Sequence, residues 1–81
     1  MNIKHAQYML TVMQEGSITA AAKKLYISQP SLSQMIKLVE TNLGTAIFNR
    51  STDPITLTYA GEKYIEAAKQ ILTINNNLQK E

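Results

Sequence analysis

The side chains best suited to chemistry gather on one face of a helix predicted over residues 28–43. That face carries hydrogen-bonding side chains and one cation: Gln29, Pro30, Ser33, Gln34 and Lys37. A glutamine can pair with both bonding groups of an adenine edge, a serine can bond a phosphate or a base, and a lysine can hold a phosphate. This composition suits contact with a polyanion such as nucleic acid. A solvated helix face that happens to lack acids is the alternative that this composition alone leaves open.

The opposite side of the same helix must attach it to a core. Leu32, Ile36, Val39 and Leu43 recur at helical spacing and form an apolar stripe. Ser28 is placed to cap the start of the helix. Pro30 falls in the first turn, where a backbone N–H has no partner within the helix, so its missing N–H costs nothing. Gly44 suits the left-handed conformation that commonly ends a helix.

Two shorter helices are predicted before it. Apolar residues follow a helical period from Asn2, a suitable N-cap, to Gly16. Ser17 can cap a second helix that runs through three consecutive alanines to Leu25, and Tyr26 and Ile27 leave only a tight connection. Two helices joined by such a turn predict a helix-turn-helix, whose second helix enters the major groove of DNA.

After Gly44, the spacing of apolar residues changes from the helical period of 3.6 to the strand period of 2. Residues 47–50 and 55–58 read as two short strands around a turn that contains Asp53 and Pro54. Thr58 can then cap a long last helix from Tyr59 to about Leu78. The predicted fold is mainly α: a winged helix-turn-helix with a three-helix core and a two-stranded wing over residues 1–58, followed by a linker or dimerisation helix over residues 59–81.

The last helix carries more apolar surface than so short a chain can cover. Its stripe is predicted as a dimer interface: Tyr64, Ile65, Ala68, Ile71, Leu72, Asn75 and Leu78. The same helix of a second copy is the expected partner in a two-fold dimer, with Asn75 fixing the register. The alternative is that the end of the helix frays in solvent.

Composition excludes several classes of protein. The 81 residues hold no cysteine, so disulfides and thiolate chemistry are excluded, and the single histidine and single aspartate offer no metal cluster and no nucleophile–base pair. No enzyme activity, metal or cofactor is therefore expected, and no apolar run is long enough to span a membrane. Residues 1–50 hold five basic and two acidic residues, and residues 51–81 hold three and four. The basic first part permits a polyanion partner, and a module used only for protein contacts remains the competing class.

Some single residues carry narrower expectations. Tyr8 and Phe48 are expected in the core, and His5 is expected to be a plain surface histidine. Leu38 lies on the flank of the third helix, either under the wing or at a dimer contact.

A set of residues and spacings makes the prediction more specific. The set is Gly16-Ser17-Ile18-Thr19, Ala21-Ala22, Leu25, Ser28-Gln29-Pro30, Ser33, Ile36, Glu40, Leu43-Gly44, Phe48, Arg50, Leu57-Thr58 and Ala60-Gly61. It resembles the amino-terminal DNA-binding domain of LysR-type transcriptional regulators over nearly the whole chain. The resemblance implies a cytoplasmic bacterial regulator of some 300 residues, in which a further domain, absent here, senses a small-molecule effector. It also implies a homodimer, with a tetramer possible in the full-length parent, on an operator that is an interrupted inverted repeat of double-stranded DNA.

The resemblance also implies which residues meet DNA. They are Gln29, Pro30, Ser33, Gln34 and Lys37 on the third helix, Ser17 and Thr19 at the start of the second, and Arg50 before the wing. Arg50 could instead be a structural partner of Glu40 or of the hairpin backbone. Two departures stand out: Gln34 replaces a frequent arginine, and Asp53 falls in a wing that is often basic in the family.

Overall fold

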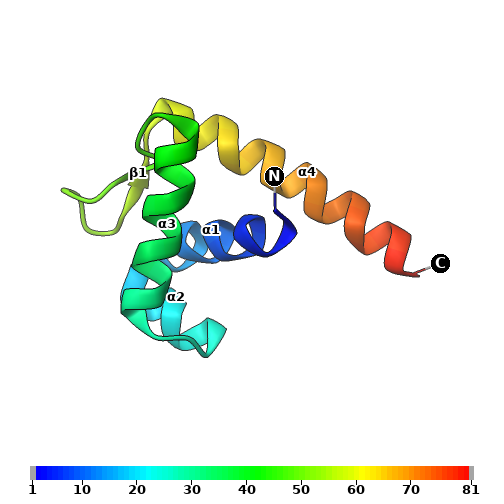
Figure 1. Cartoon of the computed structure of the whole chain (residues 1–81), viewed down its shortest axis with the longest axis horizontal. Coiled ribbons are helices and arrows are strands. Elements are labelled where there is room, and N and C mark those ends of the chain that lie inside the picture. The colour runs from blue at the N-terminus through cyan, green and yellow to red at the C-terminus, as the bar shows by residue number, and fades with distance from the viewer. Residues whose placement is uncertain (1, 81) are drawn as a thin grey trace.

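The computed structural model describes residues 2–80, without the side chain of Lys80, and shows four helices and a small hairpin (Figure 1). The helices are α1 (Ile3–Glu15), α2 (Ile18–Leu25), α3 (Gln29–Leu43) and α4 (Tyr59–Lys80), and the strands are β1 (Phe48–Asn49) and β2 (Thr56–Leu57). The predicted class, mainly α with a winged helix-turn-helix, is confirmed. The end of the predicted second segment at residue 81 lies outside the described residues.

Local capping sets the helix ends, as the sequence predicts. The side chains of Asn2, Ser17 and Ser28 accept hydrogen bonds from backbone N–H groups three residues ahead, at 3.2 Å each. Gly16 and Gly44 adopt left-handed conformations at the ends of α1 and α3. These contacts satisfy backbone groups that a helix end otherwise leaves without partners.

The wing is shorter than predicted. Its two strands pair antiparallel with Phe48 opposite Leu57 and Asn49 opposite Thr56, whereas four residues were expected in each. Flanking backbone groups bond to other parts of the fold: the N–H of Ile47 donates to Glu40, and the N–H of Ile55 donates to the carbonyl of Gly16 at 2.9 Å. The second bond ties the wing to the turn between α1 and α2.

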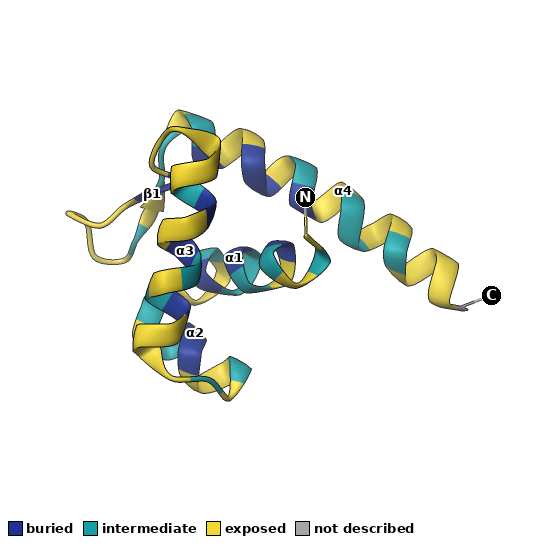
Figure 2. Ribbon diagram, in the orientation of Figure 1, coloured by how far each residue is buried: buried dark blue, intermediate teal, exposed yellow. Residues whose placement is uncertain are grey.

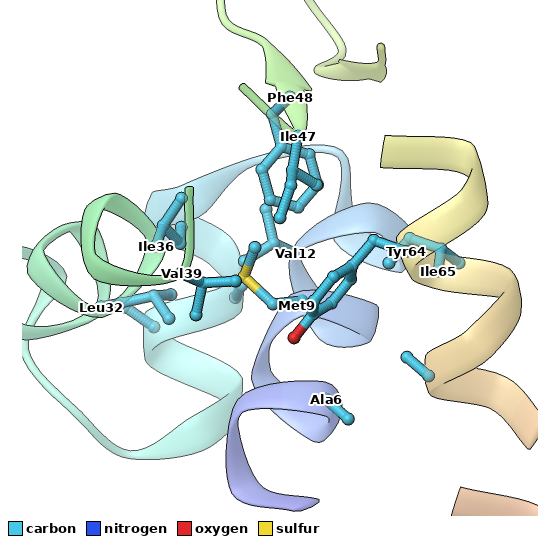
Figure 3. Packing of buried hydrophobic residues seen from close by; sticks show 13 residues of the cluster. Ala6, Met9, Val12, Leu32, Ile36, Val39, Ile47, Phe48, Tyr64 and Ile65 are labelled. Carbon is cyan, nitrogen blue, oxygen red and sulfur yellow. The ribbon is translucent and has the colours of Figure 1, made fainter. Parts of the chain in front are cut away.

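The core forms where α1 meets the other three helices (Figures 2 and 3). Met9, Val12, Leu32, Ile36 and Ile47 are its largest fully buried side chains. Burying each such side chain stabilises the fold by about 1.5–3 kcal/mol. This packing fixes the face that α3 turns away from the core.

Four single-residue expectations have mixed outcomes. Phe48 is buried as predicted, but Tyr8 is only half-buried and packs at the edge of the core. Leu43 leaves the predicted apolar stripe and is 48% exposed, because α3 ends there beyond the packed part of the helix. Leu38 is exposed as well.

Candidate nucleic-acid interface

The turn of the helix-turn-helix begins at Tyr26, which the sequence placed in the tight connection without indicating its backbone conformation. Tyr26 ends α2 in a left-handed conformation with φ of 58°, and its side chain is 95% exposed. Its N–H bonds back to the carbonyls of Ala22 and Lys23, which completes the end of α2. Such a φ is uncommon for a residue other than glycine, and an aromatic side chain gives no sequence signal for it. The turn sets the angle between α2 and α3.

The predicted polar face of α3 points away from the core (Figure 2). Gln29, Pro30, Gln34 and Lys37 are exposed, and Ser33 is half-buried. The amide of Gln29 donates a hydrogen bond of 2.8 Å to the hydroxyl of Ser33. Among the described residues, Lys37 has no ion-pair partner. The structure thus brings these predicted residues together on one accessible side.

A groove of about 570 Å³ separates this face from the wing. It is lined by Ser33, Lys37, Glu40, Thr41, Thr45, Ala46 and Arg50. Three of these residues are predicted contacts, whereas Thr41, Thr45 and Ala46 were not predicted. These residues line the groove because of the way the chain after α3 leads into the wing, so no local sequence pattern could have predicted them.

Arg50 forms the ion pair that the sequence left open as an alternative. Its guanidinium lies 3.3 Å from Oε1 of Glu40, and its side chain remains 47% exposed. The other oxygen of Glu40 accepts hydrogen bonds from the N–H groups of Ile47, at 2.7 Å, and Phe48, at 3.4 Å. Arg50 therefore has a structural partner and still offers accessible donors.

A second groove, of about 330 Å³, lies on the other side of Arg50. It is lined by Gly16, Ser17, Ile18, Thr19, Arg50, Thr52, Asp53 and Ile55. Thr19 is exposed, whereas the hydroxyl of Ser17 is engaged as the cap of α2. The start of a helix carries a partial positive charge, which favours an anion, but the carboxylate of Asp53 lines the same groove. Arg50 thus lines both grooves.

The predicted dimer stripe of α4 divides into two parts. Tyr64, Ile65 and Ala68 are at most 9% exposed and belong to the core of this chain, so they leave little surface for a second copy. Leu72 also packs partly against that core. Ile71 and Asn75 are half-buried and Leu78 is 71% exposed. Ile74, which lies outside the predicted stripe, is 66% exposed.

Tyr64 is a buried ionisable residue of α4. Figure 3 shows its ring beside Met9, and its hydroxyl has no hydrogen-bond partner among the described residues. Burial raises the pKa of this hydroxyl above its ordinary value of 10.0. Tyr64 also lines a groove of about 290 Å³, together with His5, Val39, Asn42 and Leu43.

Metal-ligating clusters and membrane-spanning helices are absent from residues 2–80. That part of the chain contains no group of three or more His, Cys, Asp or Glu side chains that could hold a metal ion. Of its four helices, none combines the length and the apolar character needed to cross a membrane.

The fold and the exposed face of α3 define the class of this protein as a winged helix-turn-helix domain. Residues 3–62 match the family described as "Bacterial regulatory helix-turn-helix protein, lysR family". The chain belongs to that family, and it is the DNA-binding domain of a transcriptional regulator rather than an enzyme.

Similar proteins agree in sequence and in structure. The chain is 44% identical over 73 residues to the HTH-type transcriptional regulator BsdA of Bacillus subtilis, covering 89% of this chain and 25% of BsdA. It is 43% identical over 76 residues to the HTH-type transcriptional regulator BudR of Klebsiella aerogenes, covering 94% and 53%. The chain therefore spans between a quarter and about half of these relatives.

Two solved complexes with DNA resemble the structure. The BenM DNA-binding domain with the catB site 1 DNA has a TM-score of 0.93, with 32% identity over 99% of this chain and 90% of that chain. The CbnR DNA-binding domain with DNA has a TM-score of 0.89, with 32% identity over 99% and 92%.

Proposed function

We propose that this chain reads a specific sequence of double-stranded DNA with α3 in the major groove, as part of a longer bacterial regulator. The observation that carries the proposal is the exposed face of α3, bordered by a groove that holds Arg50. The DNA complexes of the similar BenM and CbnR domains support it.

The residues divide into two roles by chemistry. Gln29 and Gln34 are exposed amides that can pair with adenine, and each good contact discriminates by about 1–3 kcal/mol. Lys37 and Arg50 supply charge for phosphates, which position the domain without reading sequence. Pro30 and Ser33 complete the contact surface of α3.

The start of α2 is proposed as a second place of phosphate contact. Thr19 offers an exposed hydroxyl, and Ser17 borders the same groove as Arg50. Asp53 at that groove repels phosphate, so we expect the wing to add few ionic contacts.

We also propose that two copies pair through α4. The helix has 22 residues and is about 33 Å long, and its distal half projects beyond the rest of the fold in Figure 1. Beside its core-facing side lies a second apolar stripe made of Ala60, Ala67, Ile71, Ile74 and Leu78. Its steps of three and four residues run through the buried Tyr64, which lies between Ala60 and Ala67. This spacing is typical of helices that pack against each other.

The sizes of these side chains favour an antiparallel pair. A two-fold axis beside residue 69 places Leu78 opposite Ala60 and Ile71 opposite Ala67 of the other copy. Leu78 and Ile71 then each meet a small alanine, while Ile74 lies opposite Tyr64, so both ends of the pair can pack closely. Asn75, which is half-buried beside the stripe, is suited to fixing this register.

A two-fold dimer presents two copies of α3, so the operator is expected to be an interrupted inverted repeat. The remaining proposals concern the longer parent: a location in the cytoplasm, a tetrameric state and a small-molecule effector that binds outside this chain.

Selection of binding sites from a random duplex library, at two salt concentrations, tests the proposal. Enrichment of an interrupted inverted repeat, with affinity that falls as salt rises, is expected. Gln34→Ala should relax the base preference and leave binding to random DNA nearly unchanged. If no sequence is enriched and binding does not depend on salt, the chain does not act on DNA and a protein-contact module is the better account.

A further inference from the structure

Glu40 is the single acid of α3, and it lies in the groove that faces the proposed DNA. Its side chain is only 12% exposed, and both of its oxygens are engaged. One accepts from the N–H groups of Ile47 and Phe48, and the other pairs with Arg50 at 3.3 Å. One carboxylate thus contacts the backbone at the first strand of the wing and the cation that lines both grooves.

The place of this carboxylate is unexpected on electrostatic grounds. A negative charge beside a phosphate weakens binding by repulsion, so a DNA-facing groove should lack acids. Two backbone donors and one guanidinium around Glu40 offset its charge. Because a guanidinium carries five N–H donors in a planar fork, Arg50 can face Glu40 on one side and keep donors free on the other.

We propose that Glu40 is a positioning residue for DNA binding: it holds Arg50 across the groove from Lys37, so that the groove accepts one phosphate of duplex DNA. Lys37 lines the groove from α3 and Arg50 lines it from the start of the wing. Thr41 and Thr45 line the same groove, and their hydroxyls can act as further donors. The phosphate then meets two cations that approach from different elements. This inference rests on the proposed DNA binding and adds a phosphate-binding site that includes Thr41 and Thr45.

Glu40→Gln tests the proposal because the two accounts predict opposite changes in DNA affinity. The change removes a negative charge near DNA, so electrostatics alone predicts tighter binding. If Glu40 acts through Arg50, affinity for the selected operator should instead fall about tenfold, since Arg50 loses its charged anchor. The slope of log K against log salt should become shallower by about 0.9, the loss of one phosphate contact.

The same substitution in an Arg50→Ala background separates positioning from a structural role. Without Arg50, the carboxylate has no cation to position, and its charge repels phosphate. Adding Glu40→Gln there should leave affinity unchanged or raise it. A loss of equal size in both backgrounds, or an unchanged affinity and slope in Glu40→Gln alone, overturns the proposal.

Matched variants control for charge and for folding. Glu15→Gln removes one negative charge and breaks the exposed pair with Lys24, 3.3 Å apart, and it should not weaken DNA binding. Arg50→Lys leaves the bonds of Glu40 to the wing intact, so the fold is kept even if Glu40→Gln unfolds. An ammonium lacks the fork that serves two anions, so Arg50→Lys should bind about tenfold more weakly. Equal affinity in Arg50→Lys overturns the proposal, whereas absence of salt-dependent binding in the unmodified chain overturns the proposed function itself.

Discussion

Gly61 of α4 lies against the backbone of Ile47, just before the first strand of the wing, and Gly61→Ala tests that packing. An added Cβ would lie 2.9 Å from the carbonyl carbon of Ile47 and still closer to its oxygen. Neighbouring hydrogen bonds fix this approach. The N–H of Gly61 donates to the hydroxyl of Thr58 at 2.9 Å, and that hydroxyl donates to the carbonyl of Ala46 at 2.7 Å. Backbone, rather than a movable side chain, would have to give way.

Opposing terms set the size of the effect. Alanine is favoured over glycine within a helix by about 1 kcal/mol. Overpacking costs about 1–3 kcal/mol, and each hydrogen bond loosened around Thr58 costs about 1 kcal/mol more. The net expected loss is about 2–3 kcal/mol of unfolding free energy. For a domain of this size, the melting temperature should fall by about 10–20 °C.

Thermal unfolding followed by circular dichroism measures this change. Gly44→Ala is the control, because an added Cβ there meets nothing within 4 Å and its cost comes only from the φ of 83°. We expect Gly44→Ala to lose about 1 kcal/mol, less than Gly61→Ala. If Gly61→Ala melts at or above the temperature of the unmodified chain, helix propensity dominates and the close approach has no energetic weight.

Three further changes have expected outcomes. Asp53→Arg should tighten DNA binding and steepen its salt dependence, because it replaces repulsion by attraction in the groove beside α2; titrations at several salt concentrations that show neither change would place the wing away from DNA. Ile74→Asp should weaken self-association measured by analytical ultracentrifugation, because it buries a charge in the α4 pair, whereas Thr73→Asp on the exposed side of α4 should not. Tyr64→Phe tests the buried hydroxyl. Because the folded pKa is raised, the unfolded chain releases the proton first, so this contribution to stability is present below about pH 10 and is lost as the pH rises beyond it. The melting temperature should therefore fall less steeply with rising pH above about 10 for Tyr64→Phe than for the unmodified chain. Tyr26→Phe, at a site 95% exposed, should leave this pH dependence unchanged.

Features of the fold that depend on nearby residues were predictable from sequence. The caps at Asn2, Ser17 and Ser28 bond to N–H groups three residues ahead, so residue type and position suffice. The left-handed ends at Gly16 and Gly44 follow from the same local rules. Tyr26 was the exception, because its left-handed φ is required by the turn between α2 and α3 and is not a conformation that tyrosine itself favours.

The wing and α4 show where local patterns fail. The alternating residues around Ile47 predicted longer strands, but its N–H bonds to a carboxylate seven residues earlier in the chain. The apolar stripe of α4 was visible, yet periodicity gives only its width. Which side packs on the domain, at Tyr64 and Ala68, and which side stays open, at Ile74 and Leu78, depends on where α1 lies against the helix.

The sequence by itself determined the order of the helices, the winged helix-turn-helix class and the polar face of α3, because hydrogen bonds and spacing within a few residues set them. Only the tertiary structure decided that Glu40 holds Arg50 and the wing together, that Arg50 borders two grooves and that α4 has an open apolar stripe beside its buried one. These features join residues far apart in the chain, and their positions follow from packing around α1 rather than from any local preference.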